Sequence, residues 1–124
     1  MSDTARLKKG KAMFKKAYGS VLTLPKTVTP YTENTLKNLF GEIYTRKVSM
    51  RDRRLLILGA LAGLGADPGL FEIHARSAVE NGEIKPAELE EFCLILVNYC
   101  GYPKVSPLYQ KSAQIMADAA KKKK

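Results

Sequence analysis

The chain has a single histidine, His74, and its position is the clearest sign of chemistry in the sequence. On a helical wheel drawn at about 100° per residue, apolar and small side chains flank His74 and charged side chains lie opposite. An imidazole on the apolar side of a helix can be a proton donor or base that faces a buried pocket. A core histidine bonded to a backbone carbonyl fits the same position, so both interpretations stay open. The flanking residues are Leu70, Phe71, Ile73, Ala75, Ser77 and Ala78, and those opposite are Glu72, Arg76 and Glu80.

The two cysteines, Cys93 and Cys100, lie seven residues apart on one expected helix. At about 1.5 Å of rise per residue, their Cα atoms are about 10.5 Å apart. A disulfide needs Cα atoms roughly 4.4–6.8 Å apart, so the two thiols cannot bridge within an intact helix. Small buried hydrophobic side chains are the simpler interpretation, and Cys93 is kept as a candidate site residue.

The helix that carries the histidine and the helix after it have clear local boundaries. Asp67 can cap the first helix, and Asn81-Gly82 can end it because glycine takes the left-handed conformation easily. We expect the second helix over Pro86–Cys100, since proline is favoured at the first helical position and Gly101 can end the helix. The stretch therefore predicts two helices joined by a short turn.

The rest of the chain predicts further helices. Hydrophobic residues spaced by three and four predict an amphipathic helix over Thr32–Arg46, in which Gly41 indicates close approach by a neighbour. No segment alternates between apolar and polar residues as a strand does, so the expected fold class is all-α. The other expected elements are frayed residues 1–9, a short helix over Lys11–Tyr18, an extended connector over Ser20–Pro30, a helix over Met50–Leu64 and a last helix from Ser106-Pro107 to Ala120.

Two of these helices are apolar beyond one face. After its first turns, Met50–Leu64 is apolar all round, with Gly59, Ala60, Ala62 and Gly63 interspersed. A helix that is apolar on every side must be buried on every side, and a small monomer cannot supply that cover. We therefore expect a homo-oligomer in which helices from different subunits pack together.

The chain carries a formal net charge of +9, from 21 basic and 12 acidic residues, and much of it lies near the ends. Basic ends are usually solvated or make weak nucleic-acid contacts. No zinc-finger spacing or basic stripe studded with aromatic residues supports a specific nucleic-acid module, so this partner is disfavoured. A positive field would also attract a small dianion.

Length and targeting signals favour one domain in the cytoplasm. We expect a basic segment over residues 1–30, a helical domain over residues 31–120 and a lysine tail over residues 121–124. The basic start is not followed by the apolar run of a secretory signal. The longest apolar run, Leu55–Ala66, is shorter than the roughly 20 residues of a membrane span. The expectation is a soluble cytoplasmic protein without a membrane partner.

Five segments between residues 30 and 107 resemble the carboxymuconolactone decarboxylase family in their order and spacing. The resemblance implies an all-helical subunit that assembles into rings, commonly trimers or hexamers. The segments are GEIYTR (Gly41–Arg46), RDRRLLILGALAGLG (Arg51–Gly65), HARSAVENG (His74–Gly82), PAELEE (Pro86–Glu91) and YCGYP (Tyr99–Pro103).

The family has two chemistries. One branch decarboxylates 4-carboxymuconolactone, and the other resembles alkyl hydroperoxidase D, a peroxidase that uses a Cys-x-x-Cys pair and a histidine. If the peroxidase histidine is His74, its two cysteines fall on Asp67 and Leu70, which cannot act as thiols. The resemblance therefore favours a decarboxylase; the alternatives are a peroxidase-like redox protein, which is disfavoured, and a non-catalytic oligomeric member.

Decarboxylation of a lactone acid leaves negative charge that spreads into the lactone carbonyl, so no cofactor or metal is expected. The site needs a cation for the carboxylates, a donor aimed at the oxyanion and an acid. His74 is the candidate acid or oxyanion donor. Arg53, which matches the family's recurring arginine, is the candidate anchor for a small anionic substrate because its planar fork can bind a carboxylate through two hydrogen bonds. Glu91 completes the catalytic candidates, and Glu42, Tyr44, Tyr99 and Cys93 are the candidate pocket residues.

Overall fold

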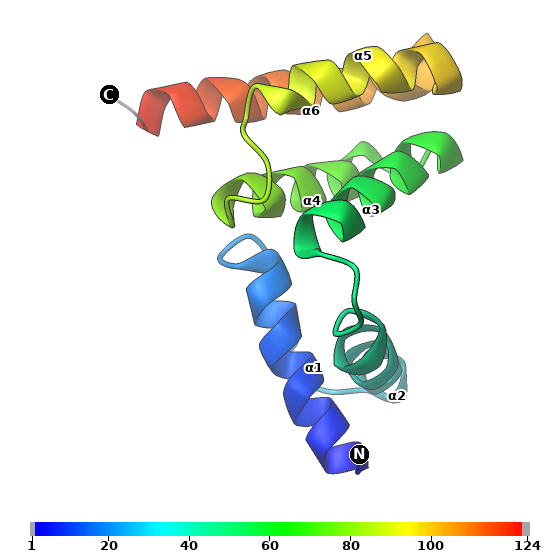
Figure 1. Cartoon of the computed structure of the whole chain (residues 1–124), viewed down its shortest axis with the longest axis vertical. Coiled ribbons are helices and arrows are strands. Elements are labelled where there is room, and N and C mark those ends of the chain that lie inside the picture. The colour runs from blue at the N-terminus through cyan, green and yellow to red at the C-terminus, as the bar shows by residue number, and fades with distance from the viewer. Residues whose placement is uncertain (1, 123–124) are drawn as a thin grey trace. The chain divides into compact units, whose positions relative to one another are not determined.

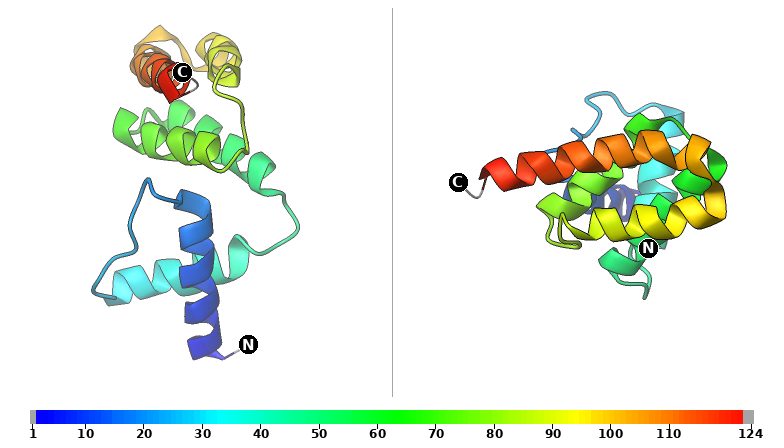
Figure 2. Two further views of the ribbon diagram at one scale, coloured as in Figure 1. Left: turned by 90° about the vertical axis from the view of Figure 1, so that its left-hand side faces the viewer. Right: turned by 90° about the horizontal axis from the view of Figure 1, so that it is seen from above.

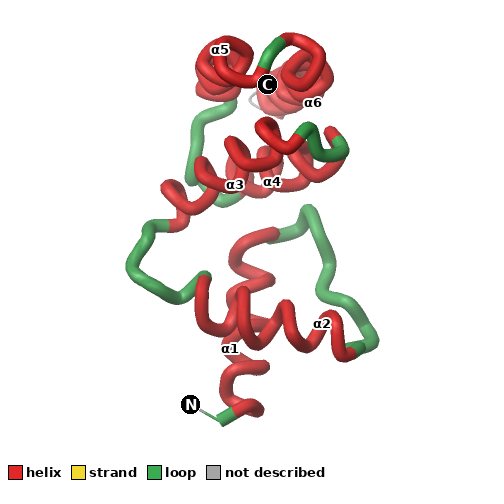
Figure 3. Tube along the Cα trace, turned by 90° about the vertical axis from the view of Figure 1, so that its right-hand side faces the viewer, coloured by secondary structure: helices red, strands yellow, loops and turns green. Residues whose placement is uncertain are grey.

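The computed structural model describes residues 2–122, and in that range every regular element is a helix (Figure 3). The expected all-α fold class is confirmed. The chain separates into two compact units between Ser49 and Met50, and each is described by itself. The domain boundary expected at residue 30 stays a prediction. Of the expected lysine tail, Lys121 and Lys122 end the last helix, and Lys123 and Lys124 lie outside the described residues.

The first unit pairs helix α1 (Asp3–Tyr18) with the π-helix η1 (Thr35–Ile43), which continues directly from the short helix α2 (Pro30–Asn34) (Figure 1). The helix expected over Thr32–Arg46 therefore begins earlier, at Pro30, and ends earlier, at Ile43. Its second part is a π-helix. Rings of both partners fill this core: Phe14 lies 5.2 Å from Phe40 between ring centroids. The expected extended connector joins α1 to α2.

The expectation of frayed residues 1–9 is wrong, because α1 begins at Asp3. Ser2 caps the helix, its side chain accepting a hydrogen bond from the backbone N–H of Ala5 at 3.2 Å. Arg6 then holds the first turn against η1, pairing with Asp3 at 2.9 Å and with Glu42 at 2.7 Å. Met1 lies outside the described residues. A local cap and ion pair order this end together with the long-range Arg6–Glu42 pair, which a local pattern does not reveal.

The close approach expected at Gly41 is confirmed. A Cβ atom at this position would lie 2.7 Å from the carbonyl oxygen of Arg6, closer than any side chain tolerates. Gly10, on the opposite helix, is still more crowded, against the backbone of Leu36. Two glycines therefore allow the backbones of α1 and η1 to touch where they cross.

The second unit consists of two helical hairpins stacked in layers (Figure 2). One layer is α3 (Met50–Leu64) with α4 (Pro68–Glu80), and the other is α5 (Glu88–Cys100) with α6 (Tyr102–Lys122). The core between them is mostly aliphatic, and α4 packs directly on α6. Its buried members are Leu58, Ala62, Phe71, Ala75, Ala78, Ile84, Leu89, Leu108 and Ile115.

Local signals locate most helix boundaries of this unit. The helix expected over Met50–Leu64 has those bounds. Gly101, with φ at +91°, ends α5 as expected. The last helix begins at Tyr102, earlier than expected, because Pro103 occupies the first turn, where a missing N–H costs little. Pro103 therefore lies in the first turn of α6, shortly after the end of α5.

Helix α3 is not covered on every side within the chain. Leu56 and Leu64 are 68% and 79% exposed, and a Cβ atom at Gly59 or Gly63 would meet nothing within 4 Å. The buried residues of α3 are Arg54, Leu58 and Ala62, which recur every four residues on one face. The expected homo-oligomer, which would cover the other faces, stays a prediction.

Across residues 2–122, every helix is too short or too polar to reach from one side of a lipid bilayer to the other.

Candidate functional site

The imidazole of His74 is bonded to a guanidinium from the neighbouring helix. Nη1 of Arg54, on α3, lies 2.9 Å from Nδ1 of His74, on α4. The two helices are consecutive and pack against each other. Asp67 accepts a hydrogen bond from the Gly69 N–H at 2.7 Å and so caps the start of α4 as expected. The cap and the α3–α4 packing together decide which side chains His74 meets.

Arg54 is held in turn by a buried carboxylate. Its Nε donates to Oε1 of Glu83 at 2.8 Å, and its Nη2 donates to Oε2 at 3.2 Å. Both side chains are almost fully buried, at 2% and 7% exposure. Gly82, at φ +73°, turns the chain after α4 and directs Glu83 back toward the helices, where Asn81 also donates to Oε2 at 3.1 Å. The carboxylate fixes the plane of the guanidinium, and with it the position of Nη1.

A buried ion pair of this kind is costly to form and costly to break. Its attraction is offset by the desolvation of both charges, but removing one partner costs about 3–5 kcal/mol because the other charge is left uncompensated. Among the described residues, every buried side-chain nitrogen and oxygen has a hydrogen-bond partner. The three groups Arg54, Glu83 and His74 therefore form one satisfied polar cluster inside the second unit, which we call the His74 cluster.

The cluster determines the protonation state of the imidazole. A guanidinium donates hydrogen bonds and cannot accept them, so Nδ1 of His74 is the acceptor and its proton lies on Nε2. Burial lowers the pKa of His74 to about 4, with the Arg54 charge adding to the decrease and the Glu83 charge opposing it. At neutral pH the ring is uncharged and offers an N–H donor. It suits stabilisation of an oxyanion better than proton donation by an imidazolium.

Sequence reasoning selected Arg53 on α3, whereas the guanidinium bonded to His74 belongs to Arg54. Arg53 is half-buried and donates to the sulfur of Met50 at 2.9 Å. A signal for Arg54 was present, because it lies four residues before Leu58 on the stripe that faces the core. Glu83 had no comparable signal, since it follows a turn and is 29 positions from Arg54.

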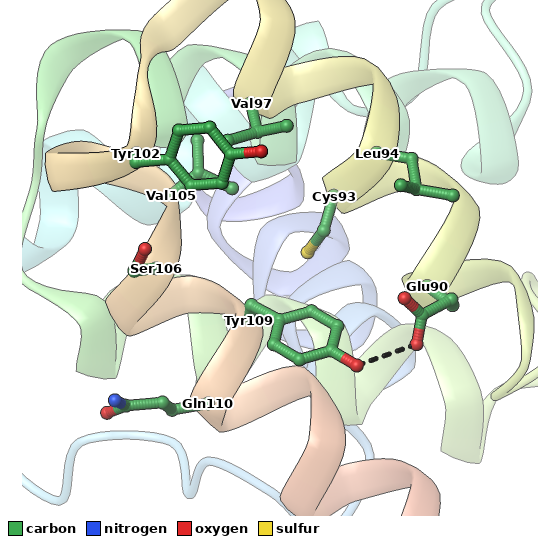
Figure 4. A pocket seen from close by; sticks show the side chains of 9 residues that line it. All are labelled: Glu90, Cys93, Leu94, Val97, Tyr102, Val105, Ser106, Tyr109 and Gln110. Carbon is green, nitrogen blue, oxygen red and sulfur yellow. Dashed lines mark hydrogen bonds between the residues drawn. The ribbon is translucent and has the colours of Figure 1, made fainter.

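Three candidates lie on α5. Cys93 is 4% exposed, and its Sγ lies 3.6 Å from Oγ of Ser112 on α6. Burial raises the pKa of the Cys93 thiol. Cys93 lines a pocket of about 310 Å³ between α5 and α6, shown in Figure 4. Glu91 and Tyr99 are exposed, Tyr99 at 88%, and neither lines that pocket.

The last two candidates belong to the first unit. Glu42 is exposed and accepts a hydrogen bond from Arg6 at 2.7 Å. Tyr44 is buried, with its ring centroid 4.4 Å from that of Phe40. In their own unit, these contacts give Glu42 a part in an ion pair and Tyr44 a part in an aromatic core.

No group of three or more histidine, cysteine, aspartate or glutamate side chains within residues 2–122 is arranged to hold a metal ion. Both cysteines are free thiols. The expectation of a reaction without metal or cofactor stays a prediction.

Comparison with known proteins finds one family. The model described as "Carboxymuconolactone decarboxylase family" matches residues 30–109, which include the whole His74 cluster. No curated protein and no solved structure gives a significant match.

Proposed function

The chain belongs to the carboxymuconolactone decarboxylase family, and on that premise we propose that it is a cofactor-independent decarboxylase of a small anionic lactone or related carboxylated compound. The observation that carries the proposal is the neutral imidazole of His74, whose Nδ1 is occupied by Arg54 at 2.9 Å. A ring held in this tautomer presents Nε2–H as a fixed donor. Such a donor suits a carboxylated substrate with a carbonyl group that receives the electron pair when the bond to the carboxylate breaks.

The reaction needs one bond to break and one to form. The bond between the carboxylate carbon and the ring carbon breaks, carbon dioxide leaves, and the electron pair moves into the carbonyl as an enolate. Nε2–H of His74 donates to the enolate oxygen, where negative charge develops. A proton from solvent then adds to the ring carbon. His74 stays neutral throughout, so in this proposal it acts as an oxyanion donor and not as the acid.

We assign the binding of the substrate carboxylate to a cation on α3, the helix that carries Arg54. Arg54 is already bound through two hydrogen bonds by Glu83. Arg53, which is half-buried on α3 and donates to the sulfur of Met50, is our candidate for the substrate carboxylate, because its guanidinium fork can bind a carboxylate through two hydrogen bonds. The net charge of +9 favours approach of an anion. Glu91 remains a catalytic candidate, and Glu42, Tyr44 and Tyr99 remain candidate pocket residues.

The peroxidase alternative is weaker on physical grounds. A peroxidatic thiol acts as a thiolate, which needs a lowered pKa and access to solvent. Burial raises the pKa of Cys93 instead, and its sulfur is nearly covered. These properties favour a structural thiol at this position.

The test is carbon dioxide release from 4-carboxymuconolactone and related lactone acids. His74→Asn is the informative variant, because its side-chain oxygen can still accept from Arg54 while the Nε2–H donor is lost. We expect kcat to fall roughly 10²–10³-fold, as when one oxyanion donor is removed, with the helical circular dichroism spectrum unchanged. The wild-type kcat/KM profile should lose activity on the acid side with an apparent pKa about 4.

Two results would refute the proposal. One is the absence of turnover on every lactone acid tested with a folded wild-type protein. The other is a folded His74→Asn protein that keeps full activity, because the reaction would then not use the imidazole.

We also propose that the protein is a homo-oligomer, with the exposed face of α3 as the contact. Leu56 and Leu64 are exposed there, and Gly59 and Gly63 leave room for another backbone to approach closely. Trimers or hexamers are the states that the family resemblance favours.

A further inference from the structure

The pocket between α5 and α6 is built from two facing helical stripes (Figure 4). Along each helix the lining residues recur at intervals of three and four, so each stripe is one face of its helix. The side chains that face one another in the middle are small, which leaves a space of about 310 Å³. The stripe on α5 is Glu90, Cys93, Leu94 and Val97, and that on α6 is Tyr102, Val105, Ser106, Tyr109 and Gln110.

The lining of this pocket is mostly apolar, with Ser106 and Gln110 as polar members on α6 and tyrosine rings at its edge. Cys93 and Val105 are buried, while Leu94 and Tyr102 are exposed. Pockets that bind small molecules combine such apolar lining with a few placed polar groups, and begin at roughly 300 Å³. The space is therefore suited to one ring or a short chain with a single polar head.

The charge at the rim is negative. Glu90 is the only Asp, Glu, Lys or Arg residue in the lining, and its Oε1 accepts a hydrogen bond from Oη of Tyr109 at 2.8 Å. That contact raises the pKa of Tyr109, which stays a protonated donor. No basic side chain in residues 2–122 forms an ion pair with Glu90, although Glu72, Glu83 and Glu88 each have at least one.

We infer that the α5–α6 pocket binds a small organic ammonium ion with an apolar body. The ammonium group would donate to the second carboxylate oxygen of Glu90 beside the ring of Tyr109, which attracts cations through its face, and Tyr102 would lie near the apolar end of the ligand. The apolar body would lie on the floor formed by Cys93 and Val105.

This inference is independent of the proposed decarboxylase. Arg54, His74 and Glu83 do not line the pocket. A carboxylate at the rim repels the anionic substrate that the His74 cluster would receive. The overall charge of +9 repels cations, so any preference of the pocket for a cation must come from its own residues.

Three ligands of similar size and different charge test the inference: phenethylammonium, 2-phenylethanol and phenylacetate. We expect titration calorimetry to give the tightest binding for phenethylammonium, roughly tenfold weaker binding for the alcohol and weaker binding still for the acid. Glu90→Gln should weaken phenethylammonium binding by a similar factor, because it removes the negative charge. The amide oxygen can still accept the hydrogen bond from Tyr109, so the pocket should keep its shape. Glu91→Gln, a neighbour outside the lining, is the matched control and should leave phenethylammonium binding unchanged.

The location is tested by nuclear magnetic resonance of ¹³C-labelled tyrosine. Phenethylammonium should shift the signals of Tyr102 and Tyr109 and leave Tyr99 unchanged. The inference is overturned if phenylacetate or the alcohol binds as tightly as the cation, if no ligand binds, or if Glu90→Gln and Glu91→Gln have equal effects. None of these results depends on decarboxylase activity.

Discussion

Acidification should destabilise the second unit through His74, and the effect can be isolated. The native state holds the imidazole neutral, with its pKa lowered to about 4 from an ordinary value of 6.5. The unfolded chain has no such environment and takes up a proton below about pH 6.5. The unfolded state therefore binds more protons between those values, and stability is lost as the pH falls from about 6.5 to about 4.

The size of the effect follows from the two pKa values. Between pH 7.5 and pH 5, the linkage relation gives about 2 kcal/mol for a shift of this size. Because the ring is only partly buried, solvent screening reduces the expectation to about 1–2 kcal/mol. That loss is a large part of the stability of a small protein.

The assay compares urea unfolding of the wild type and His74→Asn at pH 7.5 and pH 5, followed by circular dichroism. The asparagine oxygen replaces Nδ1 as acceptor for Arg54, but the side chain does not titrate. Carboxylates that titrate in this range are shared by both proteins and cancel in the difference. We expect the wild type to lose about 1–2 kcal/mol more than the variant as the pH falls.

An equal loss in both proteins would refute the reasoning, because His74 would then have the same proton affinity in the folded and unfolded states. A smaller loss in the wild type would also refute it, since that result requires a folded imidazolium stabilised by Glu83. Either result would also contradict a neutral His74 in the folded protein, on which the proposed chemistry depends.

Three further predictions concern packing. Glu83→Gln should lower the free energy of unfolding by about 3–5 kcal/mol, because Arg54 would remain buried without its counter-charge; urea unfolding measures this, and a loss below 1 kcal/mol would contradict a buried pair. Gly41→Ala should destabilise the first unit by about 1–3 kcal/mol, since its Cβ would lie 2.7 Å from a backbone oxygen of α1; a melting temperature equal to wild type would show that the helices separate at no cost. Leu56→Glu should reduce the mass measured by light scattering if α3 is the contact between subunits, and an unchanged mass would exclude that face.

Much of the helical architecture was predictable from the sequence, because its signals lie in neighbouring residues. The bounds of Met50–Leu64, the cap at Asp67 and the stop at Gly101 follow from backbone preferences that act within one turn. The family resemblance, carried by short segments in order, was likewise readable and is confirmed over residues 30–109.

Other features needed partners from distant parts of the chain. The first turn of α1 is also held by Arg6, which donates to Glu42, 36 positions away. The pocket beside Cys93 exists only because the stripes of α5 and α6 face one another.

The sequence by itself determined that one histidine lies on the apolar arc of a capped helix, because helical periodicity is local. Only the tertiary structure decided that Arg54, and not Arg53, is bonded to it. Adjacent residues on a helix point about 100° apart, so the packing of α3 on α4 selects one of them. Glu83, brought back by the turn after α4, then fixes that guanidinium and leaves the imidazole neutral. Protonation states depend on burial and on neighbouring charges, and both exist only once the helices have packed.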